Sequence, residues 1–350
     1  TMVLHRNFEK AGQTAGLEIW RIESLEPVPL PKANYGKFHE GDSYILLSTK
    51  NSGSKIWNIH FWLGKSTSQD ESGAAAILSV ELDDALGGIP VQHREVQEHE
   101  SEQFLQYFPS GVRYLPGGVA SGFKHSDINA PGEKKLYQVK GKRNVRVTLV
   151  QVDVKSLNNG DCFILDAGND IYVWVGNQAK GTERLKAINA ANIIRDQDHN
   201  GRAKVTIVDS SSSDEEVTSF FTALGSGSPS EVADSSATDD DQDHEKKQDA
   251  IVILYKVSDA SGKLVSEKLS EKPLSQSMLK SEDCFILDTI TSGIYVWVGR
   301  GSTTQEKIES LKRGQAFLEE NNYPAWTQIK RIVEGGEPVA FKEYFDDWND

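Results

Sequence analysis

One short sequence pattern occurs three times along this chain of 350 residues, and the repetition limits the possible folds more than any other feature. Each copy opens with Gly-Asp or Glu-Asp, continues through an apolar segment that ends in Ile-Leu, and reaches Trp-Leu-Gly or Trp-Val-Gly. The copies begin at Gly41, Gly160 and Glu282. A repeat of about this length is typical of one folded module used three times. Function must therefore be sought on module surfaces and in the differences between copies.

The repeated pattern predicts an α+β fold with three tandem modules, each a central mixed sheet between one long and one short helix. Module one is expected at 16–124, module two at 134–224 and module three at 250–350. Residues 225–249 are rich in Ser, Asp and Gly, so they are predicted to form an acidic, flexible linker. Module one should contain strands at 17–22, 43–47, 57–63 and 91–96 and helices at 69–86 and 101–108, and modules two and three should open with strands at 135–139 and 253–257.

Charge and composition exclude several classes of protein. The net charge of −14 leaves no excess of Lys and Arg to neutralise phosphates, so nucleic acid is not expected as a partner. The N-terminal residues contain no apolar run typical of a secretory signal, and no stretch of about 18 apolar residues predicts a transmembrane segment. Cys162 and Cys284 hold equivalent places in separate modules, so we expect buried thiols in a cytoplasmic, reducing compartment.

The long helix predicted in module one has two apolar faces on a wheel of about 100° per residue. One stripe, expected to pack on the sheet, contains Ala74, Ala75, Leu78, Leu82, Ala85 and Leu86. The second face contains Gly73, Ile77, Val80 and Asp84. Periodicity alone leaves two interpretations of this face, a second buried layer or a surface that binds another protein. Asp84 favours the binding surface, because a fully buried Asp would need a partner.

The corresponding helix of module two is less apolar on its outer face. Arg184 and Arg195 flank its stripe of small and aliphatic residues. These arginines could provide a second, electrostatic contact with a partner, or they could simply lie on a solvated face.

Each module also carries an Asp at the start of a strand and a Glu in the first turn of its long helix. The pairs are Asp42 with Glu71, Asp161 with Glu183, and Asp283 with Glu306. The Glu always stands nine residues after the repeated Trp. Two carboxylates beside a backbone carbonyl suit Ca²⁺, whereas capping of the helix N-terminus is the alternative role for the Glu. Recurrence of the whole pair favours calcium.

Other chemistries have little support in the sequence. The calcium-loop pattern of EF-hands, a zinc-binding His-Glu-x-x-His motif and a phosphate-binding Gly-Lys-Ser/Thr loop are all missing. Paired carboxylates could serve a glycosidase, but no cleft residues accompany the three copies. We therefore do not expect an enzyme, and a calcium buffer would leave the second apolar face of the long helix without a role.

Three longer segments are distinctive. They are Ser-Gln-Asp-Glu-Ser-Gly-Ala-Ala-Ala at 68–76, Val-Gln-His-Arg-Glu-Val-Gln at 91–97, and Gly-Gly-Val-Ala-Ser-Gly-Phe-Lys-His at 117–125. Together they resemble the gelsolin family. The resemblance covers nearly all of the chain after residue 15. With three modules, the chain is similar to the severin and fragmin type of family member or to the N-terminal half of a longer one.

This resemblance implies a set of calcium ligands. One ion in module one would be held by Asp42, Glu71 and carbonyls at Gly41 and Val119, and a second, shared with actin, by Asp83 and carbonyls near Gly88 and Pro90. Module two would use Gly160, Asp161 and Glu183, with Asp234 as a candidate from the linker. Module three would use Asp283 and Glu306.

The resemblance also implies contacts with actin and with polyphosphoinositides. Actin, as monomer and as filament barbed end, would be bound by Gly73, Ile77, Val80, Asp84, Phe123, Lys142, Arg143 and Arg184. Lipid would be bound by Lys134, Lys135, Lys140, Lys142, Arg143 and Arg146, although a solvated strand is the alternative reading of this basic cluster. Val175 replaces the cysteine that would form a disulfide in module two. The implied activity is calcium-regulated severing and capping of filaments, with capping alone as the alternative.

Overall fold

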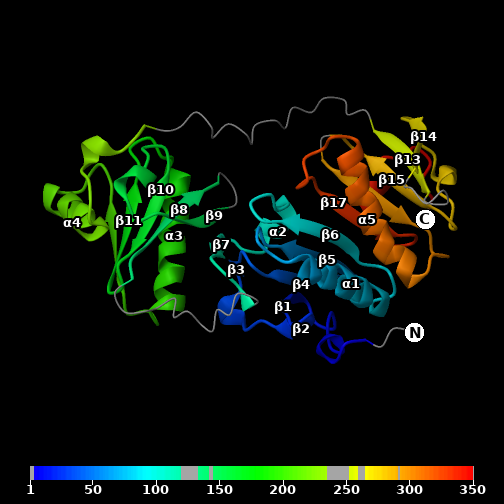
Figure 1. Cartoon of the computed structure of the whole chain (residues 1–350), viewed down its shortest axis with the longest axis horizontal. Helices are drawn as coiled ribbons and strands as arrows, with labels where there is room; N and C mark the ends of the chain where they lie inside the picture. The colour runs from blue at the N-terminus through cyan, green and yellow to red at the C-terminus, as the bar shows by residue number, and fades with distance from the viewer. Residues whose placement is uncertain are drawn as a thin grey trace. The chain divides into compact units, whose positions relative to one another are not determined.

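The computed structural model describes residues 4–119, 133–141, 145–234, 252–258, 265–290 and 292–349 (Figure 1). The chain divides into two compact units. The first contains residues 1–30, 41–101 and 247–350, and the second contains residues 31–40 and 102–246. These units do not follow the module boundaries expected from the repeat, because parts of module one fold with module two.

The first unit is built on a sheet of ten strands that belongs to both module one and module three. The two halves meet where β17 pairs antiparallel with β6, in the register Ile329↔Arg94, Lys330↔His93 and Arg331↔Gln92. In sheet order, the strands are β14 (Val265–Glu271), β13 (Ile253–Ser258), β15 (Cys284–Asp288), β16 (Ile294–Val298), β17 (Ile329–Val333), β6 (Val91–Val96), β5 (Ser54–Leu63), β4 (Ser43–Ser52), β1 (Gly16–Glu23) and β2 (Glu26–Pro29).

Two long helices, α1 (Gln69–Ala85) and α5 (Thr304–Glu320), lie side by side on one face of this sheet (Figure 1). Beneath them, residues of both modules form one apolar core, in which Phe61 and Leu82 of module one join Val296 and Phe317 of module three. Burial of a shared core of this kind is the main free-energy gain when two sheets join. On module three, a second cluster lies under the short helix α6 (Val339–Lys342).

The second unit contains a sheet of seven strands. Its order is β12 (Lys204–Val208), β11 (Asp170–Val175), β10 (Cys162–Asp166), β8 (Lys135–Lys140), β9 (Arg146–Val150), β7 (Val112–Leu115) and β3 (Lys37–His39). One face packs against α3 (Gly181–Asp198) and the other against α4 (Asp214–Leu224). The short helix α2 (Glu102–Gln106) places Phe104 on Phe38 of β3.

Local sequence signals explain where the helices begin. Ser68, Ser213 and Thr303 stand before α1, α4 and α5, and the hydroxyl of each accepts a hydrogen bond from a backbone N–H in the first turn. Such side chains satisfy N–H groups that have no partner within the helix. The end of α4 is equally local, because Gly225 adopts a left-handed conformation with φ of 89°. Short 3-10 turns lie at Arg6–Phe8, Lys32–Asn34, Val154–Ser156, Pro229–Glu231 and Gln276–Met278.

The predicted α+β class with mixed sheets is confirmed, and the long helix begins and ends within one residue of its predicted bounds. The second helix of module one is shorter than predicted, and β4 and β5 are longer. Cys162 and Cys284 are buried and unbridged, as expected, and Cys162 faces Val175 in the β10–β11 ladder. Among the described residues, no helix has both the length and the apolar composition required to cross a bilayer.

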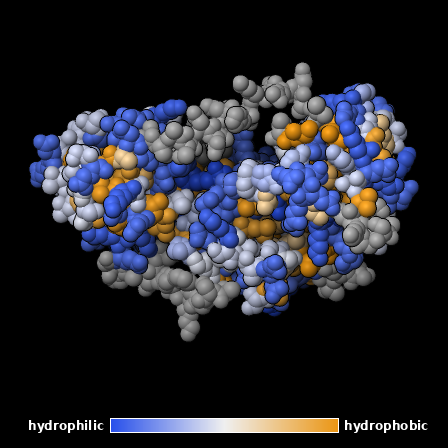
Figure 2. Space-filling model, turned by 45° about the horizontal axis from the view of Figure 1, so that its top comes forward, coloured by the Kyte–Doolittle hydropathy of each residue, from blue (hydrophilic) through white to orange (hydrophobic). Residues whose placement is uncertain are grey.

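On the face drawn in Figure 2, hydrophilic residues dominate and apolar residues form separate patches. The exposed large apolar side chains of the first unit include Ile77, Ile89 and Trp326, each about 40–50% exposed. Single exposed apolar residues are common on proteins, so their importance depends on what lies around them.

Candidate functional site

The acid pair of module one lies where β4 begins and α1 begins. Asp42 is fully buried and Glu71 is only 7% exposed. The hydroxyl of Thr67 donates to Glu71 Oε2 at 3.2 Å. The pKa of Glu71 is raised, first by burial and then by the negative charge of Asp42. The two carboxylates are therefore close enough to repel one another, and a divalent cation between them would remove that repulsion.

The acid pair of module two has a different environment. Asp161 Oδ2 accepts hydrogen bonds from the side-chain amides of Gln138 at 2.7 Å and Asn158 at 2.8 Å. Glu183 Oε2 accepts from the backbone N–H of Lys180 at 2.9 Å, so the capping role is realised here. The side-chain amide of Asn159 donates to Asp234 Oδ1 at 3.4 Å, which places this linker acid beside the segment that leads to Asp161.

In module three, Asp283 and Glu306 each interact with a different partner. Lys256 Nζ lies 2.8 Å from Asp283 Oδ2. Glu306 is exposed, and its Oε2 accepts from the backbone N–H of Thr303 at 2.6 Å while Thr303 Oγ1 accepts from the N–H of Glu306. This reciprocal arrangement is a capping box. The same sequence pattern therefore has three electrostatic settings.

The second face of α1 is only partly exposed. Gly73 is exposed and Ile77 is 40% exposed, whereas Asp84 binds Lys307 Nζ at 2.6 Å and Thr304 Oγ1 at 3.1 Å. Val80 is fully buried, so at this position the second face forms a buried layer, the first of the two interpretations that periodicity left open. Ala85, expected to pack on the sheet, is exposed. The burial of Val80 fits the position of α5 beside α1, because a helix with another helix beside it buries a wider arc than one that packs only on a sheet.

Asp83 was predicted to be a ligand shared with a partner, but it is buried in the first unit. Its Oδ2 accepts from Arg331 Nη2 at 2.8 Å, and both side chains are almost completely inaccessible. Burial raises the pKa of Asp83 to about 6, although the charge of Arg331 acts in the opposite direction. Formation of this pair requires the β17–β6 joint, so no reading of module one alone could have found it.

The carbonyls predicted for the second calcium ion lie against module three. Gly88 and Pro90 are buried, and a Cβ built at Gly336 would lie 2.8 Å from the carbonyl oxygen of Gly88 and 2.9 Å from that of Ile89. Only glycine fits this close approach of two backbones. Module three thus covers both the acid and the carbonyls predicted for that ion.

Arg94 of β6 and His99 in the turn after β6 both contact the segment before β17. Arg94 Nη2 donates to the carbonyl oxygens of Ala325 at 2.5 Å and Thr327 at 3.2 Å. The ring of His99 stacks on Trp326 with centroids 4.2 Å apart, and Gln328 Nε2 donates to the carbonyl of His99 at 2.8 Å. These contacts could not be predicted from the sequence, because their partners lie more than 200 residues apart.

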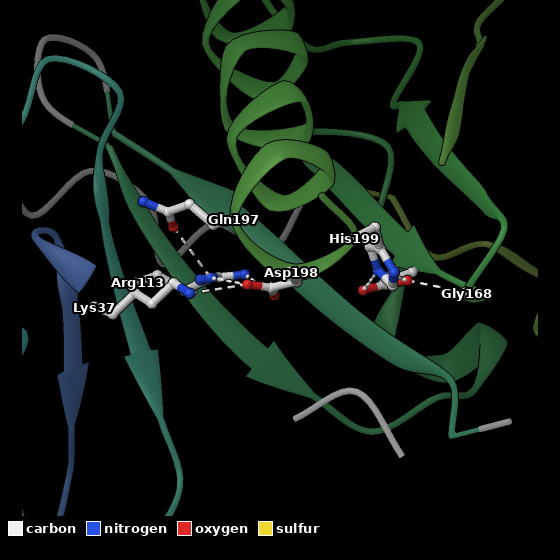
Figure 3. A network of polar contacts seen from close by, with 7 residues as sticks. Lys37, Arg113, Gly168, Gln197, Asp198 and His199 are labelled. Carbon is white, nitrogen blue, oxygen red and sulfur yellow. Dashed lines mark hydrogen bonds and ion pairs between the residues drawn. The ribbon is translucent and has the colours of Figure 1, made fainter. Parts of the chain in front are cut away.

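The second unit holds a polar network that the sequence did not reveal (Figure 3). Asp198, at the end of α3, binds Lys37 Nζ at 2.9 Å and Arg113 Nη1 at 2.8 Å. Burial alone would raise the pKa of Asp198, but the hydrogen bonds and charges of Arg113 and Lys37 bring it below its ordinary value. Beside it, His199 lies 2.8 Å from Asp166. The network fastens β3 and β7 to α3.

The predicted basic cluster is divided along β8. Lys140 and Arg146 face each other across the β8–β9 ladder. Lys134 and Lys135 lie at the opposite end of β8, where Lys134 is exposed and Lys135 is half-buried. Arg184 donates to Asp209 at 3.0 Å. Phe123, Lys142 and Arg143 lie outside the described residues, and Gly41, Gly160 and Val119 remain predicted carbonyl ligands.

Comparison with known proteins identifies the class to which this architecture belongs. The gelsolin repeat matches residues 24–105, 143–217 and 265–342. The chain is 67% identical, over 99% of its length and 92% of the relative's, to "Actin depolymerising venom protein gelsolin 1" from Platymeris rhadamanthus.

Two longer relatives agree with this assignment. They are the gelsolin of Drosophila melanogaster, 60% identical, and the cytoplasmic gelsolin of Homarus americanus, 50% identical. The chain covers 44% and 46% of their lengths, and they cover 99% and 98% of the chain. The chain belongs to the gelsolin family.

Proposed function

We propose that this protein binds actin under the control of calcium, severs filaments and caps their barbed ends, without enzymatic activity. The observation that carries the proposal is the half-exposed face of α1 around Gly73 and Ile77, whose far end at Asp84 is held by α5. A relative of 67% identity is named as actin-depolymerising, which supports actin as the partner. Capping without severing is the second candidate, because the same face could hold a barbed end without breaking a filament.

Module three acts as an inhibitor in this proposal. Its Arg331 and Lys307 bind Asp83 and Asp84, the last two acids on α1, and its α5 lies beside the helix that would enter actin. A partner that needs Asp84 must displace Lys307 first. The apparent affinity for actin would then be reduced by the fraction of molecules in which module three is docked.

Calcium would act through the acid pairs. Binding between Asp42 and Glu71 would neutralise two buried negative charges at the first turn of α1, on the helix whose last turn holds Asp83 and Asp84. A ligand shifts a conformational equilibrium only by its differential affinity for the two states. The proposal therefore requires that calcium bind more tightly when modules one and three are apart.

Module two would bind the side of the filament, with Arg184 and the basic hairpin containing Lys140 and Arg146 as candidate contacts. The same hairpin, together with Lys142 and Arg143, is our candidate for polyphosphoinositides. A cytoplasmic location remains part of the proposal, supported by two free, buried thiols.

Depolymerisation of pyrene-labelled actin filaments, with and without free calcium on the order of micromolar, tests the proposal. We expect rapid, calcium-dependent loss of filament mass and shorter filaments in images. Seeded elongation separates the two candidates, because a pure capping protein blocks growth at barbed ends without shortening preformed filaments. Filaments of unchanged length together with unchanged growth at barbed ends, at every calcium concentration, would reject both.

A further inference from the structure

Two histidines and a glutamate form a buried cluster in the sheet of the first unit, and none of them belongs to the three acid pairs. His60 of β5 and His93 of β6 are direct cross-strand partners. Glu95 lies two residues beyond His93, so its side chain shares the same face of the sheet. His60 and Glu95 are fully buried and His93 is 2% exposed. One potential ligand atom from each residue lies within 4.8 Å of the others.

One ring nitrogen of His93 carries no proton and is available to bind a metal ion. His93 Nε2 lies 2.9 Å from the side-chain oxygen of Asn58, which can only accept, so Nε2 carries the proton and Nδ1 presents its lone pair. That Nδ1 is buried and has no hydrogen-bond partner, which is costly for a polar atom inside a protein. A histidine whose second nitrogen donates to an oxygen is the usual arrangement of a metal ligand.

The other two residues are equally well oriented. Glu95 Oε1 lies 2.9 Å from His60 Nδ1 and accepts from Ser101 Oγ at 2.6 Å. Glu95 Oε2 accepts from the backbone N–H of Ser101 at 2.8 Å. Contacts of this kind hold a carboxylate in position whether or not a cation is bound.

From this geometry we propose that His60, His93 and Glu95 form a binding site for a divalent transition-metal ion of the zinc class. Two imidazole nitrogens and one carboxylate oxygen match the ligands that Zn²⁺ selects. The acid pairs offer only oxygen and suit calcium instead. The site goes beyond the proposed function, since it requires neither actin nor calcium.

Binding requires two local changes. The rings of His60 and His93 stack with centroids 4.3 Å apart and an interplanar angle of 10°, and a metal lies near the plane of each imidazole that binds it, so one ring must turn. His60 Nδ1 carries a proton toward Glu95 Oε1, and this proton must move to Nε2 before Nδ1 can bind an ion. Binding would therefore break the stacked arrangement of the two rings.

The positive charge of Lys330 opposes binding of the ion. Lys330 of β17 faces His93 across the joint between modules three and one. Because Lys330 belongs to module three, we expect metal binding to be weaker while the modules are joined.

The test is a calorimetric titration of the full chain with Zn²⁺ in excess Ca²⁺ and Mg²⁺, which occupy the oxygen sites. We expect one saturable step with one equivalent of Zn²⁺, weakened at least tenfold in His93→Gln and in Glu95→Gln. His5→Gln is the matched control, because His5 lies 3.2 Å from Glu26 but near the surface, and it should bind as the parent does. Lys330→Met should bind more tightly.

Co²⁺ absorption of the unmutated chain provides a readout that does not depend on the folding of variants. Intense visible bands of a four-coordinate ion support the site, whereas the weak bands of a six-coordinate ion contradict it. The proposal is overturned if the parent shows no saturable Zn²⁺ step. It is also overturned if correctly folded His93→Gln and Glu95→Gln proteins retain that step, or if the step disappears in His5→Gln.

Discussion

Modules one and three carry the same acid pair in the same pattern, yet their carboxylates have opposite surroundings. Asp42 and Glu71 are buried together, and the charge of one raises the pKa of the other. In module three, Asp283 is bound by Lys256 and the carboxylate of Glu306 caps its own helix. The repeat thus preserves the strand–helix junction, whereas neighbouring residues set the charge around its two carboxylates.

The largest expected effect is on stability, and it concerns Arg331 of module three, which binds Asp83 of module one. Arg331→Met leaves Asp83 buried without its cation, and removal of one partner from a buried ion pair costs about 3–5 kcal/mol. We expect this loss in the free energy of unfolding from urea titrations. Lys256→Met removes the partner of Asp283 within module three. This ion pair is much more exposed than that of Arg331 with Asp83, so the free energy of unfolding should change little.

A double variant isolates the cause. Asp83→Leu combined with Arg331→Met replaces the pair with apolar groups, so it should recover most of the lost stability. If the double variant is as unstable as Arg331→Met alone, the packing of the arginine rather than the unpaired charge of Asp83 holds the joint.

The second prediction extends the comparison to an acid in the other unit whose partners are both cations. The pKa of Asp198 is below its ordinary value of 3.8, so its stabilising effect is present above that pH and disappears as the pH falls through the folded-state pKa. Asp198→Asn should therefore cost about 1.5–3 kcal/mol at pH 7 and progressively less in acid. Urea midpoints across pH provide the measurement, and the exposed neighbour Asp196→Asn is the control. A pH-independent difference would contradict the assignment.

These contrasts also show what could be predicted from the sequence. The helix bounds followed from signals within a few residues, such as Ser68 before α1 and Thr303 before α5. The contact of Arg331 with Asp83 spans 248 positions, and no periodicity of one helix reports it. For the same reason, the wheel left open whether the second face of α1 is buried at Val80. The proximity of Asp42 and Glu71 was predicted because the repeat fixes the junction, whereas the role of Lys256 was missed because nothing in the repeated pattern singles out that lysine.

The third prediction tests the comparison through calcium itself. Glu71→Gln removes one of two facing carboxylates, so the affinity of the module-one site should fall about tenfold or more. Glu306→Gln removes a carboxylate already committed to capping, and total calcium binding should change much less. Calorimetric titrations with Ca²⁺ measure the affinity of both variants. Lys256→Gln is a third variant for the same titration, and it should strengthen calcium binding in module three. Equal losses in Glu71→Gln and Glu306→Gln would mean that the two settings are equivalent once calcium is present.

The smallest expected effect is a shift in the melting temperature without calcium. It discriminates best between modules one and three, because the sign of the shift should differ between them. The raised pKa of Glu71 means that its ionisation opposes folding at neutral pH without calcium, and Gln still accepts the hydrogen bond from Thr67. Glu71→Gln should therefore raise the calcium-free melting temperature slightly. Glu306→Gln weakens the capping box by about 0.5 kcal/mol or less and should lower it. Differential scanning calorimetry in a calcium chelator measures both shifts, and shifts of the same sign would show that the two glutamates stabilise their helices in the same way.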